Sequence, residues 1–131
     1  VLTHRLLGIE MDQLSDLMKQ STKPCNISSM CTIFAESEII SYLSQKENVA
    51  DIAAGTGRSI AKRVLAMGRA AQIPYDEPIV FSGGVANNPA IADIFADLLH
   101  KPVKAIALPQ STAALGAAIR ALREYKKEQK A

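Results

Sequence analysis

The second half of the chain alternates short apolar runs with helical patterns, and this alternation constrains the fold more than any other feature. The apolar runs at Ile79–Ser82 and Val103–Ile106 are strand-length, and a pattern of helical spacing follows each of them. A helix-length connection joins neighbouring strands in parallel, so residues 78–128 predict a strand–helix–strand–helix unit. Two strands alone do not form a stable sheet. We therefore expect the rest of the sheet to come from outside this chain and the exposed edge to recruit another chain.

The first half predicts helices. Residues 1–20 carry helical spacing, residues 21–29 form a polar loop around Pro24, and a helix is predicted over residues 31–45. Asn48 is placed to cap a long helix over residues 48–73. The chain opens at Val1 without a methionine, directly in a helical pattern, which suggests that it was cut from a longer protein.

Bulk composition excludes several classes of protein. A chain of 131 residues suffices for one domain. Its 15 basic and 13 acidic residues give a net charge of +2, so charge does not argue for a nucleic-acid partner. No apolar run approaches the roughly 18 residues of a membrane span. Cys25 and Cys31 form neither a CxxC motif nor a disulfide framework, which predicts a reducing, cytoplasmic location.

The glycine pair Gly83–Gly84 lies where the first predicted strand ends and a capped helix is about to begin. Ligands of α/β proteins bind at the carboxyl ends of strands, and glycines allow a ligand to approach the backbone closely. The same pair also suits an ordinary turn that needs a positive φ. Both interpretations stay open on this stretch alone.

A second glycine-containing stretch, "AAGTGRS" at Ala53–Ser59, invites comparison with a phosphate-binding loop. It lacks the preceding strand and the GK[ST] ending of that motif, and it lies inside a helical pattern. Glycines there predict close packing by another helix or by a flat ligand. Arg58, Lys62 and Arg63 either face a nucleotide or form a solvated surface.

The stretch "CTIFAESE" places Cys31 at the start of a predicted helix and two carboxylates behind it. A helix N-terminus favours a thiolate, which binds iron or attacks an electrophile, although Cys31 also suits a small buried position. On a helical projection, Glu36 lies in the middle of an apolar stripe formed by Ile33, Ile40 and Leu43. We therefore expect Glu36 to be buried and to accept a hydrogen bond, with Glu38 on the other side.

Four stretches together resemble a known family: "ISSMCTIFAESEIISYLS", "DIAAGTGRSIAKRV", "IVFSGGVANNPAI" and "PQSTAALGAAIRAL". Their order and spacing are similar to those of activators of 2-hydroxyacyl-CoA dehydratases. That family of BadF/BadG/BcrA/BcrD-type ATPases includes ATP-binding subunits of benzoyl-CoA reductases. The resemblance covers nearly the whole chain, and "CTIFAESE" is its most specific motif.

The resemblance implies an α/β fold of the actin, hexokinase and Hsp70 type, in which this chain is the C-terminal ribonuclease-H-like half. It implies ATP or ADP with Mg²⁺ in a cleft and a homodimer bridged by one [4Fe-4S] cluster. ATP hydrolysis would then drive an electron into the dehydratase or CoA-ester reductase partner. Cys31 corresponds to the later cluster cysteine of each subunit, whereas Cys25 has no corresponding role. The residues expected at the nucleotide are Gly83, Gly84, Val85, Asn87 and Lys62.

Important parts of the family pattern are missing from the chain. These are the N-terminal aspartate-bearing phosphate motif, the second phosphate motif and the first cluster cysteine. Ile52 stands where that cysteine would precede "AAGTGR". No catalytic residue is identified, and the chain alone is expected neither to hydrolyse ATP efficiently nor to hold a full cluster. Two alternatives stay open: a sugar-kinase-like ATPase domain with a structural Cys31, and a non-catalytic interaction domain.

Overall fold

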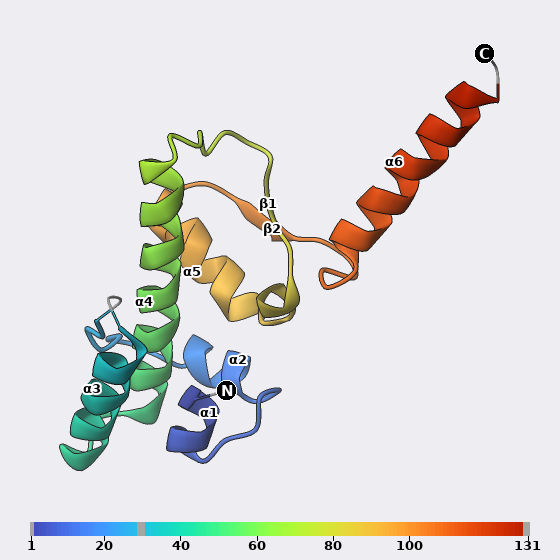
Figure 1. Cartoon of the computed structure of the whole chain (residues 1–131). Helices are drawn as coiled ribbons and strands as arrows, with labels where there is room; N and C mark the ends of the chain where they lie inside the picture. The colour runs from blue at the N-terminus through green and yellow to red at the C-terminus, as the bar shows by residue number, and fades with distance from the viewer. Residues whose placement is uncertain (1, 29–30, 130–131) are drawn as a thin grey trace.

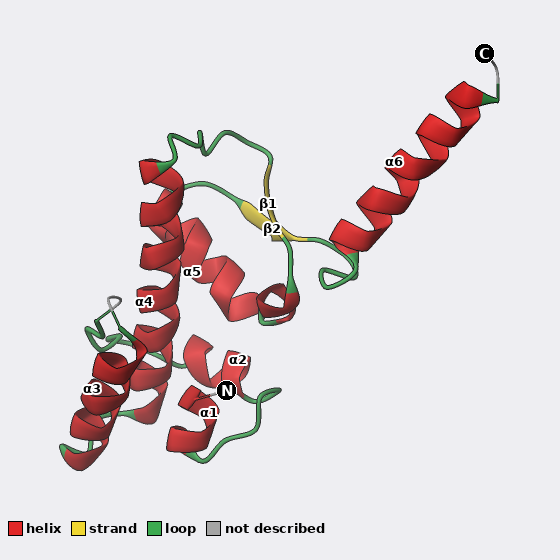
Figure 2. Cartoon of the chain, viewed as in Figure 1, coloured by secondary structure: helices red, strands yellow, loops and turns green. Residues whose placement is uncertain are grey.

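The computed structural model describes residues 2–28 and 31–129 of the chain, and Figure 1 shows how their elements are arranged. The elements follow one another as α1 (Leu2–Leu7), α2 (Leu14–Lys19), α3 (Thr32–Ser44), α4 (Val49–Ala70), β1 (Ile79–Phe81), the 3₁₀ turn η1 (Gly84–Asn87), α5 (Pro89–Leu99), β2 (Val103–Ala105) and α6 (Thr112–Glu128). Helix predominates, as Figure 2 shows. None of these helices is long and apolar enough to cross a membrane.

The two strands lie side by side and run parallel, as the sequence predicts. Ile79 pairs with Val103, and Phe81 pairs with Ala105 at the carboxyl end of both strands. Helix α5 connects them and packs against one face of the sheet, where the rings of Phe81 and Phe95 lie 5.1 Å apart. Each strand has a single neighbour among the described residues, so each leaves an edge open.

Helix α4 forms the centre of the molecule. The side chain of Asn48 caps it by accepting a hydrogen bond from Ala50 N at 2.8 Å, which confirms the predicted N-cap. Small residues let neighbouring elements approach α4 closely. A Cβ added at Gly57 would lie 2.9 and 3.0 Å from the side chains of Ile94 and Ile91. The predicted close packing at this glycine is therefore correct, and its partner is α5.

Helix α3 buries a different face from the one predicted. Its buried residue is Ile39, which is 1% exposed, whereas Ile33 and Ile40 are 69% and 48% exposed. Glu36 is only partly buried, and none of the residues that the structure describes donates a hydrogen bond to it. The prediction of a buried, hydrogen-bonded Glu36 is wrong because α3 packs on α1 and α4 through the face centred on Ile39.

Helix α6 extends away from the rest of the molecule, as Figure 1 shows. It buries none of its residues. This arrangement leaves the apolar side chains of a 17-residue helix uncovered within the chain.

Candidate functional site

The turn after β1 lies at the carboxyl end of the sheet, where it contacts the loop after β2. Gly83 N donates a hydrogen bond to Pro109 O at 2.9 Å, which ties the two loops together. Gly83 adopts φ +96°, a conformation that favours glycine. A Cβ added there would meet no atom within 4 Å, so the backbone conformation alone explains the need for glycine.

Gly84 has no such backbone requirement. A Cβ at Gly84 would lie 3.7 Å from Gln110 Nε2, which is an ordinary van der Waals distance. The protein itself therefore leaves room for a side chain at this position. Gln110 was not among the predicted site residues, although its place in the loop after the second strand, in "PQST", was a signal that could have identified it.

The other two predicted residues of this turn differ in what they contribute. Val85 is 56% exposed. Asn87 Nδ2 donates to Gly84 O at 3.1 Å, so the amide of Asn87 stabilises the turn. Together with Gly83 and Gly84, these residues form one exposed backbone turn at the strand ends, the position where α/β folds bind ligands.

Lys62 lies elsewhere. It is exposed on α4 and lines a small cavity against the loop that carries Cys25, together with Arg58 and Ser59. None of the residues of the glycine turn lines this cavity. Arg58 is engaged by Asp97, with Nη1 and Oδ2 2.6 Å apart.

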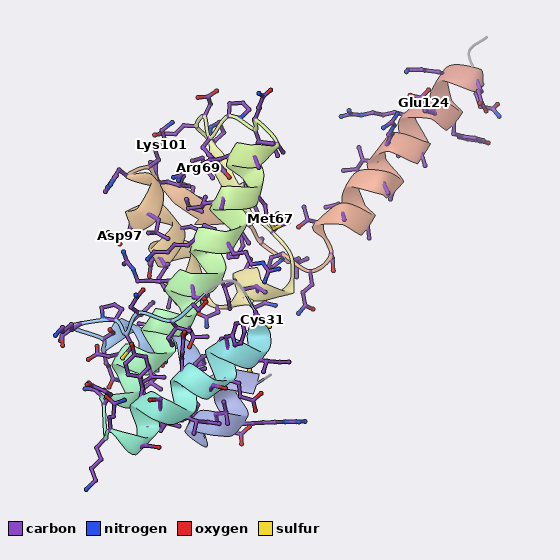
Figure 3. The ribbon with its side chains drawn as sticks, turned by 60° about the vertical axis from the view of Figure 1, so that its left-hand side comes forward. Cys31, Met67, Arg69, Asp97, Lys101 and Glu124 are labelled. Carbon is purple, nitrogen blue, oxygen red and sulfur yellow. The ribbon has the colours of Figure 1, made fainter. Side chains whose placement is uncertain are left out.

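Cys31 is the N-cap residue of α3, one position before the first helical turn in which the sequence placed it. Its backbone is extended, with φ −145° and ψ 138°, and its carbonyl accepts the hydrogen bond from Ala35 N at 3.0 Å. The thiol is free and partly exposed. Figure 3 shows Cys31 at the beginning of α3.

The loop before Cys31 is fixed by Asp51, a buried residue in the first turn of α4. One carboxylate oxygen of Asp51 accepts hydrogen bonds from Ser21 Oγ at 2.6 Å, Thr22 N at 3.0 Å and Lys23 N at 2.9 Å. The Ser21 hydroxyl makes the largest contribution to holding the pKa of Asp51 below its usual value. Asp51 O also accepts a hydrogen bond from Cys25 N at 2.9 Å.

Further contacts anchor this loop at Ser28. Ser59 Oγ donates to Ser28 O at 3.1 Å, and Ser28 N donates to a carboxylate oxygen of Glu38 at 2.5 Å. Glu38, and not Glu36, is therefore the carboxylate of "CTIFAESE" that accepts a backbone hydrogen bond. The sequence predicted neither the contact of Ser59 with Ser28 nor that of Glu38 with Ser28, because a contact between a loop and a helix leaves no periodic signal in the sequence.

The surroundings of Cys25 disfavour the thiolate form of its side chain. Burial, followed by the negative charges of Glu47 and Asp51, raises the pKa of the Cys25 thiol. A thiolate is the form that binds iron, so this environment disfavours Cys25 as a metal ligand. The residues described contain no cluster of three or more cysteine, histidine or acidic side chains. With two cysteines, the chain cannot itself supply the four thiolates of a [4Fe-4S] cluster, so such a cluster would need ligands from elsewhere.

The chain belongs to the BadF/BadG/BcrA/BcrD ATPase family, whose family model matches residues 1–121. It is 37% identical over 126 residues to the 2-hydroxyisocaproyl-CoA dehydratase activator of Clostridioides difficile, covering 96% of this chain and 47% of that protein. It is 41% identical over 125 residues to the (R)-2-hydroxyglutaryl-CoA dehydratase activating ATPase of Acidaminococcus fermentans, covering 95% of this chain and 46% of that protein. The chain thus spans about half the length of these relatives.

Solved structures of two such activators share the fold. The activator of the 2-hydroxyisocaproyl-CoA dehydratase from Clostridium difficile, with bound ADPNP, superposes with a TM-score of 0.87 at 37% identity, covering 98% of this chain and 47% of the other. Component A of the Acidaminococcus fermentans (R)-2-hydroxyglutaryl-CoA dehydratase gives a TM-score of 0.84 at 37% identity, covering 91% and 45%. The predicted fold class, largely helical with two parallel strands and with dehydratase activator ATPases as structural neighbours, is confirmed.

Proposed function

We propose that this chain is the C-terminal part of an ATP-dependent, iron–sulfur electron-transfer activator of a 2-hydroxyacyl-CoA dehydratase or a related CoA-ester reductase. The observation that carries the proposal is the superposition on an activator with bound ADPNP, combined with an open glycine turn at the carboxyl ends of the parallel strands. Family membership argues against the sugar-kinase alternative. Two free cysteines also suit the reducing cytoplasm.

In this proposal the turn Gly83–Asn87 binds the nucleotide, which is ATP or ADP with Mg²⁺. Backbone groups at Gly83 and Gly84 can approach a flat base or a ribose closely because neither residue carries a side chain of its own. Gln110 lies beside Gly84 and supplies a donor and an acceptor to the same space. Lys62 lines a different cavity. It would contact the nucleotide only if another part of the protein brought α4 and the turn together.

Substitution of Gly84 tests the nucleotide site. Gly84→Ala adds a methyl group that the fold accommodates but a closely approaching ligand does not, so we expect ADPNP affinity to fall by about tenfold or more. The measurement is calorimetric titration of ADPNP into the full-length protein that carries this chain. Gly116→Ala is the control: it makes the same exchange in α6, where the added Cβ would meet nothing within 4 Å. Unchanged affinity in Gly84→Ala would refute the assignment.

We further propose that Cys31 supplies one thiolate to a [4Fe-4S] cluster shared by two subunits of a homodimer. When bound, the cluster supplies a carrier for one electron. The chain's own contribution is to hold Cys31, with its partly exposed thiol, at the N-terminus of α3 and to fix the loop before it through Asp51. Cys25 stays outside this role.

The cluster proposal is tested by iron content and visible absorption after anaerobic purification of the full-length protein. Cys31→Ser should lose most of the iron and the absorption while ADPNP binding persists, because the glycine turn is a separate site. Cys25→Ser is the control and should retain both. A Cys31→Ser protein with a full complement of iron would show that Cys31 is structural, and a colourless wild-type protein that binds no nucleotide would favour the interaction-domain alternative.

A further inference from the structure

Gln110 carries a side-chain amide that the fold leaves unused at the carboxyl end of the sheet. Gln110 is exposed, and none of the other described residues forms a hydrogen bond with its amide. The amide of Asn87 is engaged, because its Nδ2 donates to Gly84 O. The amide of Asn88 is turned inward, with Nδ2 3.9 Å from Met18 Sδ and with a buried Oδ1. Of these three amides, that of Gln110 therefore has both its donor and its acceptor free for a ligand.

The loop that carries Gln110 is held in place beside the glycine turn. Pro109 O accepts hydrogen bonds from Gly83 N at 2.9 Å and from Thr112 Oγ1 at 3.2 Å, which ties the loop to the turn and to the first turn of α6. A Cβ added at Gly84 would lie 3.7 Å from Gln110 Nε2 and 4.0 Å from Gln110 Cγ. A ligand that approaches the backbone of Gly84 therefore meets the Gln110 amide, on a loop that is already ordered before binding.

A glutamine amide distinguishes between the two purine bases. It presents an N–H donor beside a C=O acceptor. Adenine presents the acceptor N7 beside the amino donor at N6, so the amide pairs with both groups. Guanine presents two acceptors on the same edge, N7 and O6, so the amide oxygen would face another acceptor. A side chain that only donates, such as lysine or arginine, has the opposite preference.

We propose that Gln110 selects adenine over guanine at the glycine turn by pairing its side-chain amide with N6 and N7 of the base. The inference rests on the proposed nucleotide site and adds to it the residue that chooses the base. The solved activator that is 37% identical to this chain contains ADPNP, an adenine nucleotide. Gln110 has no part in the proposed cluster, so its substitution should change the choice of base and leave the iron content unchanged.

The test compares the affinities of ADPNP and its guanosine counterpart, GDPNP, by calorimetric titration of the full-length protein that carries this chain. The wild type should bind ADPNP at least about tenfold more tightly than GDPNP. Gln110→Lys replaces the acceptor by a donor and should shift the ratio of the two affinities toward GDPNP by about tenfold or more. Gln110→Ala removes both groups and should bind the two nucleotides with nearly equal affinity. Because both nucleotides carry the same phosphates, the ratio separates recognition of the base from the effect of the added charge.

Gln129→Lys is the matched control, because it adds the same charge at the far end of α6 and should keep the wild-type ratio. Gln110 is exposed, so its variants should keep the circular dichroism spectrum of the wild type. A wild type without a preference for ADPNP, or Gln110 variants that keep the wild-type ratio, would overturn the proposal while leaving the nucleotide site in place. A wild type that binds neither nucleotide would refute the site itself, and the selection by Gln110 with it.

Discussion

Gly55 shows how one residue on α4 positions the loop that leads to Cys31. A Cβ added at Gly55 would lie 2.2 Å from Cys25 O and 3.0 Å from Cys25 N, and both atoms belong to the backbone. Asp51, one turn earlier, holds the same loop by accepting hydrogen bonds from Ser21, Thr22 and Lys23. The loop therefore lies directly on the helix, and only glycine permits this distance.

Gly55→Ala should displace the loop and lower the free energy of unfolding by about 1–3 kcal/mol, the usual cost of overpacking. Urea unfolding followed by circular dichroism measures this change. Gly116→Ala is the control, because its added Cβ meets nothing within 4 Å and alanine favours a helix by up to about 1 kcal/mol over glycine. Equal stability of the two variants would contradict the close contact at Cys25.

At the scale of elements, α3 illustrates how a helix is fixed by the face that it buries. Ile39 and Ile40 are adjacent and chemically identical, but they are 1% and 48% exposed. Ile39 packs with Ile27 and Ile52, whereas Ile40 points away from that cluster. The same rotation that buries Ile39 brings Glu38 to the backbone of Ser28.

Substituting each of the two isoleucines in turn tests this orientation of α3. Ile39→Ala should lower the free energy of unfolding by about 2–5 kcal/mol, because it leaves a cavity among buried side chains. Ile40→Ala, at an exposed site, should change it by no more than about 0.5 kcal/mol. Thermal and urea unfolding of both variants measure the difference. A larger loss in Ile40→Ala would restore the orientation predicted from the sequence.

At the scale of the whole molecule, α6 differs from the body, which comprises all the elements before it: the body has a buried core and α6 has no buried residue. The body has a core built from α2, α4 and α5, in which residues such as Ala53, Ala61 and Phe95 are buried. Helix α6 adds no buried residue to this core.

Removal of residues 112–131 tests this separation. The shortened chain should keep its free energy of unfolding within about 0.5 kcal/mol, because no buried contact is lost. The denaturant m-value should also change little, since it follows the surface that unfolding exposes. Urea unfolding monitored by tyrosine fluorescence measures both quantities. A loss of several kcal/mol would show that α6 packs on the body in solution.

The amino-acid sequence by itself determined the local elements and one of their pairings. Asn48 predicts the start of α4 because its side chain satisfies a backbone N–H of the first turn, and this bond is present. The helix-length connection predicts that β1 and β2 are parallel neighbours, and the structure sets their register. The glycine turn at Gly83 followed from the strand that precedes it. Each of these features depends on residues close in sequence or on short-range geometry.

Only the tertiary structure decided which faces meet. Helical periodicity predicted the wrong buried side of α3, because Ile33, Ile39 and Ile40 offer apolar residues on more than one face, and packing on α1 and α4 selected Ile39. Packing likewise placed Lys62 beside the Cys25 loop, since the position of a helix relative to a distant turn depends on contacts between elements. The uncovered face of α6 has the same physical origin: an amphipathic pattern specifies that a helix must be covered, but it does not specify by what.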